Sequence, residues 1–103
     1  MEGLELICFQ IISEVGSARS FYIEAIKEAK QGNFEEANNL VSEGDACFVK
    51  GHHVHGELIQ KEANNEKTEI SLLLIHTEDL LISTETFKVL AEEFIDLYRM
   101  VIG

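Results

Sequence analysis

The chain contains no proline, and this absence constrains its fold more than any other feature of the sequence. Proline is the strongest helix breaker, because it lacks a backbone N–H and its ring clashes with the preceding turn. Apolar residues recur at three- and four-residue intervals along most of the chain, which is the spacing of one helix face. The sequence therefore predicts an all-α protein built from long helices.

The first helix is expected over about residues 4–30. Gly16 interrupts its pattern, so a local bend or a close contact with another helix is expected there. The polar segment QGNFEEA then breaks the pattern. Within it, Gly32 suits a left-handed C-cap and Asn33 suits the N-cap of a second helix.

The second helix is expected to run to about Ala63. Gly44, Gly51 and Gly56 each cost roughly 1 kcal/mol of helix stability relative to alanine, which indicates either close packing or a loose middle. The polar segment NNEKTE forms the second break. Thr68 is the expected N-cap of a third helix that reaches nearly to the last residue.

Short links between long helices place consecutive helices antiparallel to each other. The predicted fold is therefore an antiparallel up-down-up three-helix bundle, formed by one domain of residues 1–103. The third helix carries more apolar positions than one seam can bury, so one of its faces would stay exposed in a monomer. We therefore expect the bundle to associate with further copies of itself.

The charge of the chain narrows the range of its partners. Nineteen acidic residues against eight basic ones give a net charge of −11, which repels nucleic acids and anionic lipids and favours a basic protein partner.

No stretch approaches the roughly 20 apolar residues of a membrane span, and the acidic start MEGLELICF lacks the basic region of a signal peptide. We expect a cytoplasmic protein without membrane insertion, in which Cys8 and Cys47 are buried free thiols.

The run LLLIHTEDLLIS, residues 72–83, places polar side chains inside an apolar helical pattern. His76 and Asp79 are three residues apart and therefore share a helix face. A histidine in such surroundings is ordinarily packed and hydrogen-bonded. A carboxylate one turn later can instead orient the imidazole, bind a cation, or meet its symmetry mates at an oligomer axis.

Three of the four histidines lie together in GHHVHG, at His52, His53 and His55. His52 and His55 are three residues apart, a spacing that can hold a metal ion. No glutamate lies three residues before any histidine, as di-iron bundles require, and there is no HExxH motif. The cluster is interpreted either as a polar helix face or as the lining of a site.

The chain resembles the lactose/cellobiose-type IIA component of the bacterial sugar phosphotransferase system (PTS). The motifs that carry the resemblance are VGSARS in the first helix, QGNFEEA at the first turn, the second-helix pattern from Ala46 through His52 to LIQKEA, and SLLLIHTED before an apolar helix that contains LYR. The resemblance covers nearly all of the chain. It implies a phosphocarrier that assembles as a nine-helix homotrimer, which would account for the surplus of apolar residues in the third helix.

The resemblance also implies roles for single residues. His76 matches the family's phosphorylated histidine, which receives a phosphoryl group from the histidine phosphocarrier protein and passes it to a cysteine of the sugar-specific IIB component during uptake of a β-linked disaccharide of the lactose, cellobiose or chitobiose type. Asp79 matches the aspartate that binds a divalent cation, expected to be Mg²⁺, on the trimer axis. Mid-helix N–H groups are already paired, so His52 and His55 on the neighbouring helix are candidates for contacting the phosphate.

Three departures from the family pattern bear on this site. Glu78 stands where the family has glutamine, Leu80 where it has a second histidine, and His55-Gly56 where it has QT. Glu78 places a like charge near an incoming phosphate, and Leu80 removes a hydrogen-bond donor. Both changes disfavour phosphohistidine unless His53 or His55 compensates.

Two alternative functions therefore stay open. The first is a helical interaction protein of the same fold that is no longer phosphorylated. The second is a metal-binding bundle built on His52, His55 and His76. A transition metal lost in His52→Ala would indicate that bundle, whereas a hard cation lost in Asp79→Ala would indicate the trimer axis, because carboxylate oxygens suit Mg²⁺.

Overall fold

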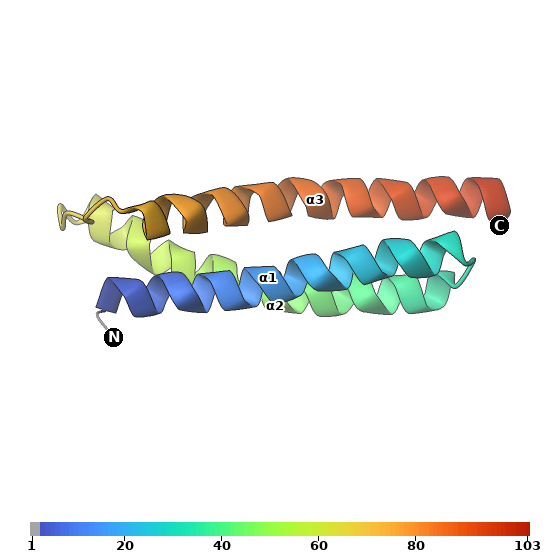
Figure 1. The fold of residues 1–103 in the computed structure, drawn as a ribbon, viewed down its shortest axis with the longest axis horizontal. Helices are drawn as coiled ribbons and strands as arrows, with labels where there is room; N and C mark the ends of the chain where they lie inside the picture. The colour runs from blue at the N-terminus through green and yellow to red at the C-terminus, as the bar shows by residue number, and fades with distance from the viewer. Residues whose placement is uncertain (1–2) are drawn as a thin grey trace.

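The computed structural model describes residues 3–103, which form three long helices joined by two short links (Figure 1). Helix α1 spans Gly3–Lys30, α2 spans Phe34–Ala63 and α3 spans Leu72–Ile102. Consecutive helices run in opposite directions, and the bundle measures 52 × 22 × 20 Å. The predicted up-down-up three-helix bundle is confirmed. None of these three helices has both the length and the apolar character that crossing a membrane requires.

The turn between α1 and α2 has the predicted glycine and the predicted N-cap residue, but the side chain of that residue does not cap the helix. Gly32 has a φ of 81°, a left-handed conformation that glycine adopts without strain. The backbone N–H of Asn33 donates to the Glu28 carbonyl at 2.9 Å. Asn33 precedes α2, but its side chain donates to Glu28 Oε2 at 2.8 Å and makes no cap bond. Asn33 is therefore the N-cap residue of α2, as predicted, but its carboxamide binds back to α1 and does not cap the helix.

Helix α3 begins later than the sequence suggested. Thr68 is not its cap; Ser71 Oγ accepts from the Leu74 N–H at 3.1 Å, and Ser71 has the extended backbone of an N-cap. Ser71 directly precedes the apolar run, so this start keeps the whole run helical. The predicted cap at Thr68 is therefore wrong, and the N-cap lies three residues later, at the second hydroxyl residue of this segment.

Helix α1 holds the bundle together, because it contacts both other helices while α2 and α3 barely touch. Its buried residues lie on the inner side of the helix, and they are mostly small or β-branched: Cys8, Ile11, Val15, Ala18, Tyr22, Ala25 and Ala29. Small side chains allow helix axes to approach closely. The weak contact between α2 and α3 leaves a groove between them.

Two glycines of α2 are needed for the approach of α1. A Cβ atom at Gly44 would lie 2.6 Å from Tyr22 Cε1, and one at Gly51 would lie 2.7 Å from Val15 Cγ2. Close packing, one of the two interpretations of these glycines, is therefore confirmed at both positions. A Cβ atom at Gly16 would have no neighbour within 4 Å, and α1 continues through this residue, so the close contact considered there is not found.

One polar link joins all three helices. The buried Tyr22 hydroxyl of α1 donates to Asp45 Oδ1 of α2 at 2.7 Å, and Lys88 Nζ of α3 lies 3.4 Å from the same oxygen. Burial, together with the hydrogen bond to Asp45, raises the pKa of Tyr22 above its ordinary value of 10.0. The phenol therefore stays neutral and keeps donating to Asp45.

Gly44→Ala should destabilise the protein by about 1–3 kcal/mol, because the added methyl group overlaps the Tyr22 ring. Gly56→Ala is the matched control, since no atom lies within 4 Å of its Cβ position. The control should leave stability unchanged or raise it by up to about 1 kcal/mol through helix propensity. Urea unfolding measures both values, and equal stability of the two variants would contradict the packing described for Gly44.

Stability should also fall above about pH 10 because of Tyr22. The pKa of Tyr22 is higher in the folded than in the unfolded chain, so its contribution is complete below the unfolded pKa and is lost as the pH rises toward the folded pKa. Tyr22→Phe should be about 1 kcal/mol less stable at neutral pH but lose less stability at alkaline pH. Unfolding free energies at both pH values test this, and parallel pH profiles for the two proteins would contradict it.

Candidate functional site

His76 lies on the exposed surface of α3 rather than in the core. The following residue, Thr77, is completely buried, and its hydroxyl donates to the Leu73 carbonyl at 2.7 Å. Leu81, one turn later, is buried as well. These two residues fix the rotation of α3 and leave His76 turned outward. Within residues 3–103 no hydrogen bond or ion pair engages the His76 side chain, so its imidazole is open to a partner.

Asp79 is also exposed, one turn after His76. Nothing in the described part of the chain bonds it to the imidazole, so orientation of His76 by Asp79, one of the alternatives above, is not found. Asp79 lies instead between the exposed residues Ile75 and Ile82, at helical spacings of four and three. Covering a carboxylate that lies between apolar side chains is costly unless a cation or a donor meets it.

His55 of α2 and Glu78 of α3 are bonded to each other. His55 Nε2 lies 2.7 Å from Glu78 Oε1 and 2.9 Å from Oε2. The His55 side chain is only 14% exposed and the Glu78 side chain 38%. The structure thus joins two of the residues predicted to neighbour the phosphate, through a contact between α2 and α3.

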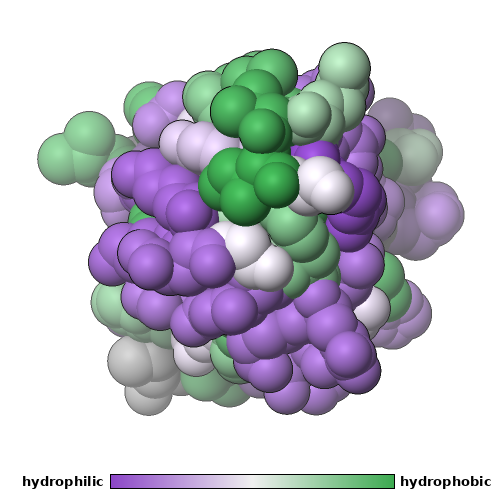
Figure 2. Space-filling model, turned by 90° about the vertical axis from the view of Figure 1, so that its right-hand side faces the viewer, coloured by the Kyte–Doolittle hydropathy of each residue, from purple (hydrophilic) through white to green (hydrophobic). Residues whose placement is uncertain are grey.

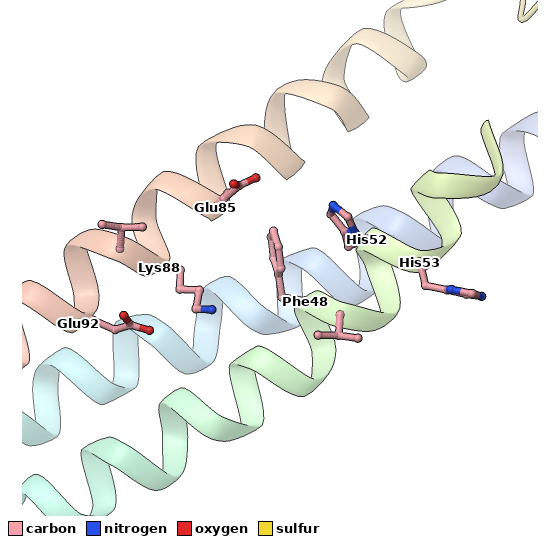
Figure 3. A pocket seen from close by; sticks show the side chains of 8 residues that line it. Phe48, His52, His53, Glu85, Lys88 and Glu92 are labelled. Atoms are coloured by element: carbon pink, nitrogen blue, oxygen red, sulfur yellow. The ribbon is translucent and has the colours of Figure 1, made fainter. Parts of the chain in front are cut away.

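His52 belongs to the groove between α2 and α3, which has a volume of about 570 Å³ (Figure 3). Its ring lies beside Phe48, with ring centroids 6.3 Å apart. His53 also lines the groove, although its ring points away from α3. The other residues that line the groove are Val49, Glu85, Lys88, Val89 and Glu92. His52 and His53 therefore both line the groove, and neither belongs to the bonded pair of His55 and Glu78.

No three histidine, cysteine, aspartate or glutamate side chains of residues 3–103 lie close enough together to hold a metal ion. The alternative of a metal site on His52, His55 and His76 therefore has no site within one chain. His55 Nε2 is moreover occupied by Glu78. An Asp79 site of the kind that the resemblance implies would need carboxylates from several chains.

Exposed apolar side chains extend along α3, and we call this set the apolar face of α3. Its members are Leu72, Ile75, Ile82, Val89, Leu90, Phe94, Leu97, Met100, Val101 and Ile102. Figure 2 views the bundle from the end at which α3 terminates, and hydrophobic residues gather there over α3 while hydrophilic residues cover much of the rest. The predicted surplus of apolar residues is confirmed, since the chain itself leaves this face uncovered.

The sequence did not reveal two connections of this region. The bond between His55 and Glu78 and the contacts of Asp45 with Tyr22 and Lys88 both cross between helices. Opposite charges at these positions were the only available signal, and a chain with 19 acidic residues offers many such pairings.

The fold and the site define an all-helical bundle protein whose candidate reactive group is an accessible histidine on one helix. Comparison with known families then identifies the particular family. The family described as PTS system, lactose/cellobiose-specific IIA subunit matches residues 6–99. The chain belongs to this family and is a phosphotransferase component. The resemblance seen in the sequence motifs is confirmed.

Relatives agree with this assignment in sequence and in structure. The lichenan-specific phosphotransferase enzyme IIA component of Bacillus subtilis is 44% identical, over 97% of this chain and 91% of the relative. The PTS cellobiose-specific enzyme IIA of Bacillus anthracis superposes with a TM-score of 0.95 at 48% identity, over 98% and 93% of the two chains. The IIA(chitobiose) protein of the Escherichia coli phosphotransferase system, solved in complex with HPr, gives 0.85 at 30% identity, over 100% of both chains.

Proposed function

We propose that this chain relays phosphoryl groups for the uptake of a β-linked disaccharide, of the lactose, cellobiose or chitobiose type. His76 accepts the group from the histidine phosphocarrier protein, HPr, and passes it to a cysteine of the sugar-specific IIB component. The observation that carries this proposal is the exposed, unengaged imidazole of His76 on α3 of a IIA family member. The related chitobiose protein was solved with HPr, which supports HPr as the donor.

The proposed relay exchanges one bond to phosphorus for another. A lone pair on a ring nitrogen of His76 attacks the phosphorus of the donor's phosphohistidine, while the donor's P–N bond breaks and its nitrogen keeps the electron pair. The cysteine thiolate of IIB then attacks the same phosphorus, and His76 is restored. Such transfer needs in-line geometry and neutralisation of the phosphoryl oxygens. The backbone N–H groups around His76 are paired within α3, so side chains must supply that neutralisation.

The surface charge suits a basic donor. The net charge of −11 attracts a basic protein and repels nucleic acid, and opposite potentials speed encounter and set orientation.

The cysteines Cys8 and Cys47 are both free, and Cys8 is buried, as expected for it, while Cys47 is half-buried. Free thiols fit a reducing compartment, so the proposed location is the cytoplasm.

We also propose that the apolar face of α3 is buried in a homotrimer of nine helices. An exposed apolar strip along a whole helix is the kind of surface that association covers. Asp79 lies within this strip, so three copies would bring three carboxylates together. Carboxylate oxygens are the ligands that a hard divalent cation such as Mg²⁺ prefers, and the cation would offset their mutual repulsion.

Phosphorylation of His76 is tested by intact mass after incubation with phosphoenolpyruvate, enzyme I and HPr under non-acidic conditions. We expect wild type to gain one phosphoryl group and His76→Ala to gain none. His53→Ala serves as the control, because His53 is exposed and points away from α3, and it should be phosphorylated like wild type. A wild-type protein that is correctly folded but gains no mass would instead favour the phosphorylation-silent interaction protein.

The axial cation is tested by elemental analysis of purified protein. We expect one divalent cation for every three chains, and its loss in Asp79→Ala. Asp96→Ala is the matched control, since Asp96 is an exposed aspartate of α3 that pairs with Arg99 of its own chain at 3.5 Å. Retention of the cation in Asp79→Ala, or a transition metal that is lost only in His52→Ala, would contradict the proposed site.

A further inference from the structure

His55 of α2 and Glu78 of α3 are bonded to each other. We propose that His55 is a positioning residue for phosphoryl transfer: it holds and neutralises the Glu78 carboxylate, so that this charge does not oppose a phosphoryl group arriving at His76. This inference rests on the proposed function of His76. It assigns His55 a role in the reaction without contact with the transferred group.

The contact has the geometry of a restrained hydrogen bond, which becomes an ion pair when His55 is protonated. His55 Nε2 approaches both carboxylate oxygens of Glu78, at 2.7 and 2.9 Å. The His55 side chain is 14% exposed, so the surrounding helices limit its freedom to leave the carboxylate. Partial burial reduces screening by solvent, and a charge at this place acts more strongly on its surroundings than one on an open surface.

The helix places the Glu78 charge near the phosphoryl acceptor. Glu78 follows His76 by two residues, so the two side chains leave α3 on different sides, with buried Thr77 between them. Glu78 reaches α2, where His55 binds it, while His76 stays exposed. The carboxylate nevertheless stays within one turn of the imidazole. Left unpaired, its charge would act across α3 on a phosphoryl dianion that arrives at His76, through surroundings in which the effective dielectric constant is below that of water.

The other cationic side chains of the region do not replace His55. Within residues 3–103 no lysine or arginine lies at ion-pair distance from Glu78. Lys88, further along α3, pairs with Asp45. His52 lies in the groove beside Phe48, and His53 lines the same groove with its ring pointing away from α3 (Figure 3). Neutralisation of Glu78 therefore depends on His55.

The bond between His55 and Glu78 also links two helices, and an experiment must separate this effect from the pairing of the Glu78 charge. It links α2 to α3, which otherwise barely touch. Removing His55 would both free a charge and remove this link. Combining the change at His55 with Glu78→Gln distinguishes the two effects, because the double variant removes the charge but does not restore the link.

The test measures the rate of phosphoryl transfer from phosphorylated HPr to wild type, His55→Ala and His55→Ala/Glu78→Gln by rapid quench. We expect His55→Ala to be slower by about tenfold, a defect that shrinks as salt is added. The double variant should recover to within about threefold of wild type, because the amide carries no charge. His53→Ala, from the same cluster, should transfer at the wild-type rate.

Each other outcome overturns a stated part of the proposal. Equal rates for wild type and His55→Ala remove the role of His55. A double variant as slow as the single one assigns the effect to the lost helix link and removes charge neutralisation. If His55→Ala does not fold, His55→Gln keeps a donor for Glu78, and a wild-type rate in that variant overturns neutralisation. Wild type that accepts no phosphoryl group refutes the function of His76 itself, a result distinct from these.

Discussion

The packing of α1 against both other helices is the constraint on which the rest of this structure depends. Tyr22 lies against Gly44 and Val15 against Gly51, so close that no Cβ atom fits at either glycine. Alanines along α1 permit a similar approach elsewhere. Because α1 alone makes extensive contacts with both neighbours, α2 and α3 are left apart from each other. The groove between them and the uncovered face of α3 are consequences of this arrangement.

The rotation of α3 about its own axis converts this packing into a site. Thr77 and Leu81 are buried against the rest of the bundle, and the 3.6-residue period then determines where the neighbouring side chains lie. His76 and Asp79 are exposed, while Glu78 is directed to α2. A change that shifted the buried positions by one residue would move the imidazole out of reach of a partner. The fold therefore acts on the proposed chemistry chiefly through presentation of His76.

The acidic charge of the chain also affects the site. A chain with a net charge of −11 attracts a basic donor but must still admit a phosphoryl group. The structure responds by pairing acidic groups where helices meet: Asp45 contacts Tyr22 and Lys88, and Glu78 contacts His55. The side chains of these pairs are only partly exposed, at 14% and 38% for His55 and Glu78 and at 34% and 38% for Lys88 and Asp45. Their partial burial makes their placement more consequential for local potential than for the free energy of folding.

The sequence by itself determined the three helices, the left-handed turn at Gly32, the apolar surplus of α3 and the candidate His76. The first three features follow from local backbone preferences and from periodicity within one helix, which a linear sequence records directly. His76 was singled out by the resemblance of its motif to the family. Short sequence motifs also indicate the family. The sequence misplaced the start of α3 at Thr68 and the side-chain role of Asn33, because several nearby polar groups competed for the same backbone donors.

Only the tertiary structure decided which side chains meet between helices. Tyr22 with Asp45, and His55 with Glu78, are each separated by 23 residues along the chain. Such pairings depend on the register between helices, and the fit of Tyr22 at Gly44 and of Val15 at Gly51 fixes the register of α1 against α2. Steric fit between surfaces that are distant in the chain leaves no periodic pattern in the sequence, so it cannot be predicted from periodicity. For that reason the sequence could nominate His55 as a neighbour of the site, but only the packed bundle assigned Glu78 as its partner.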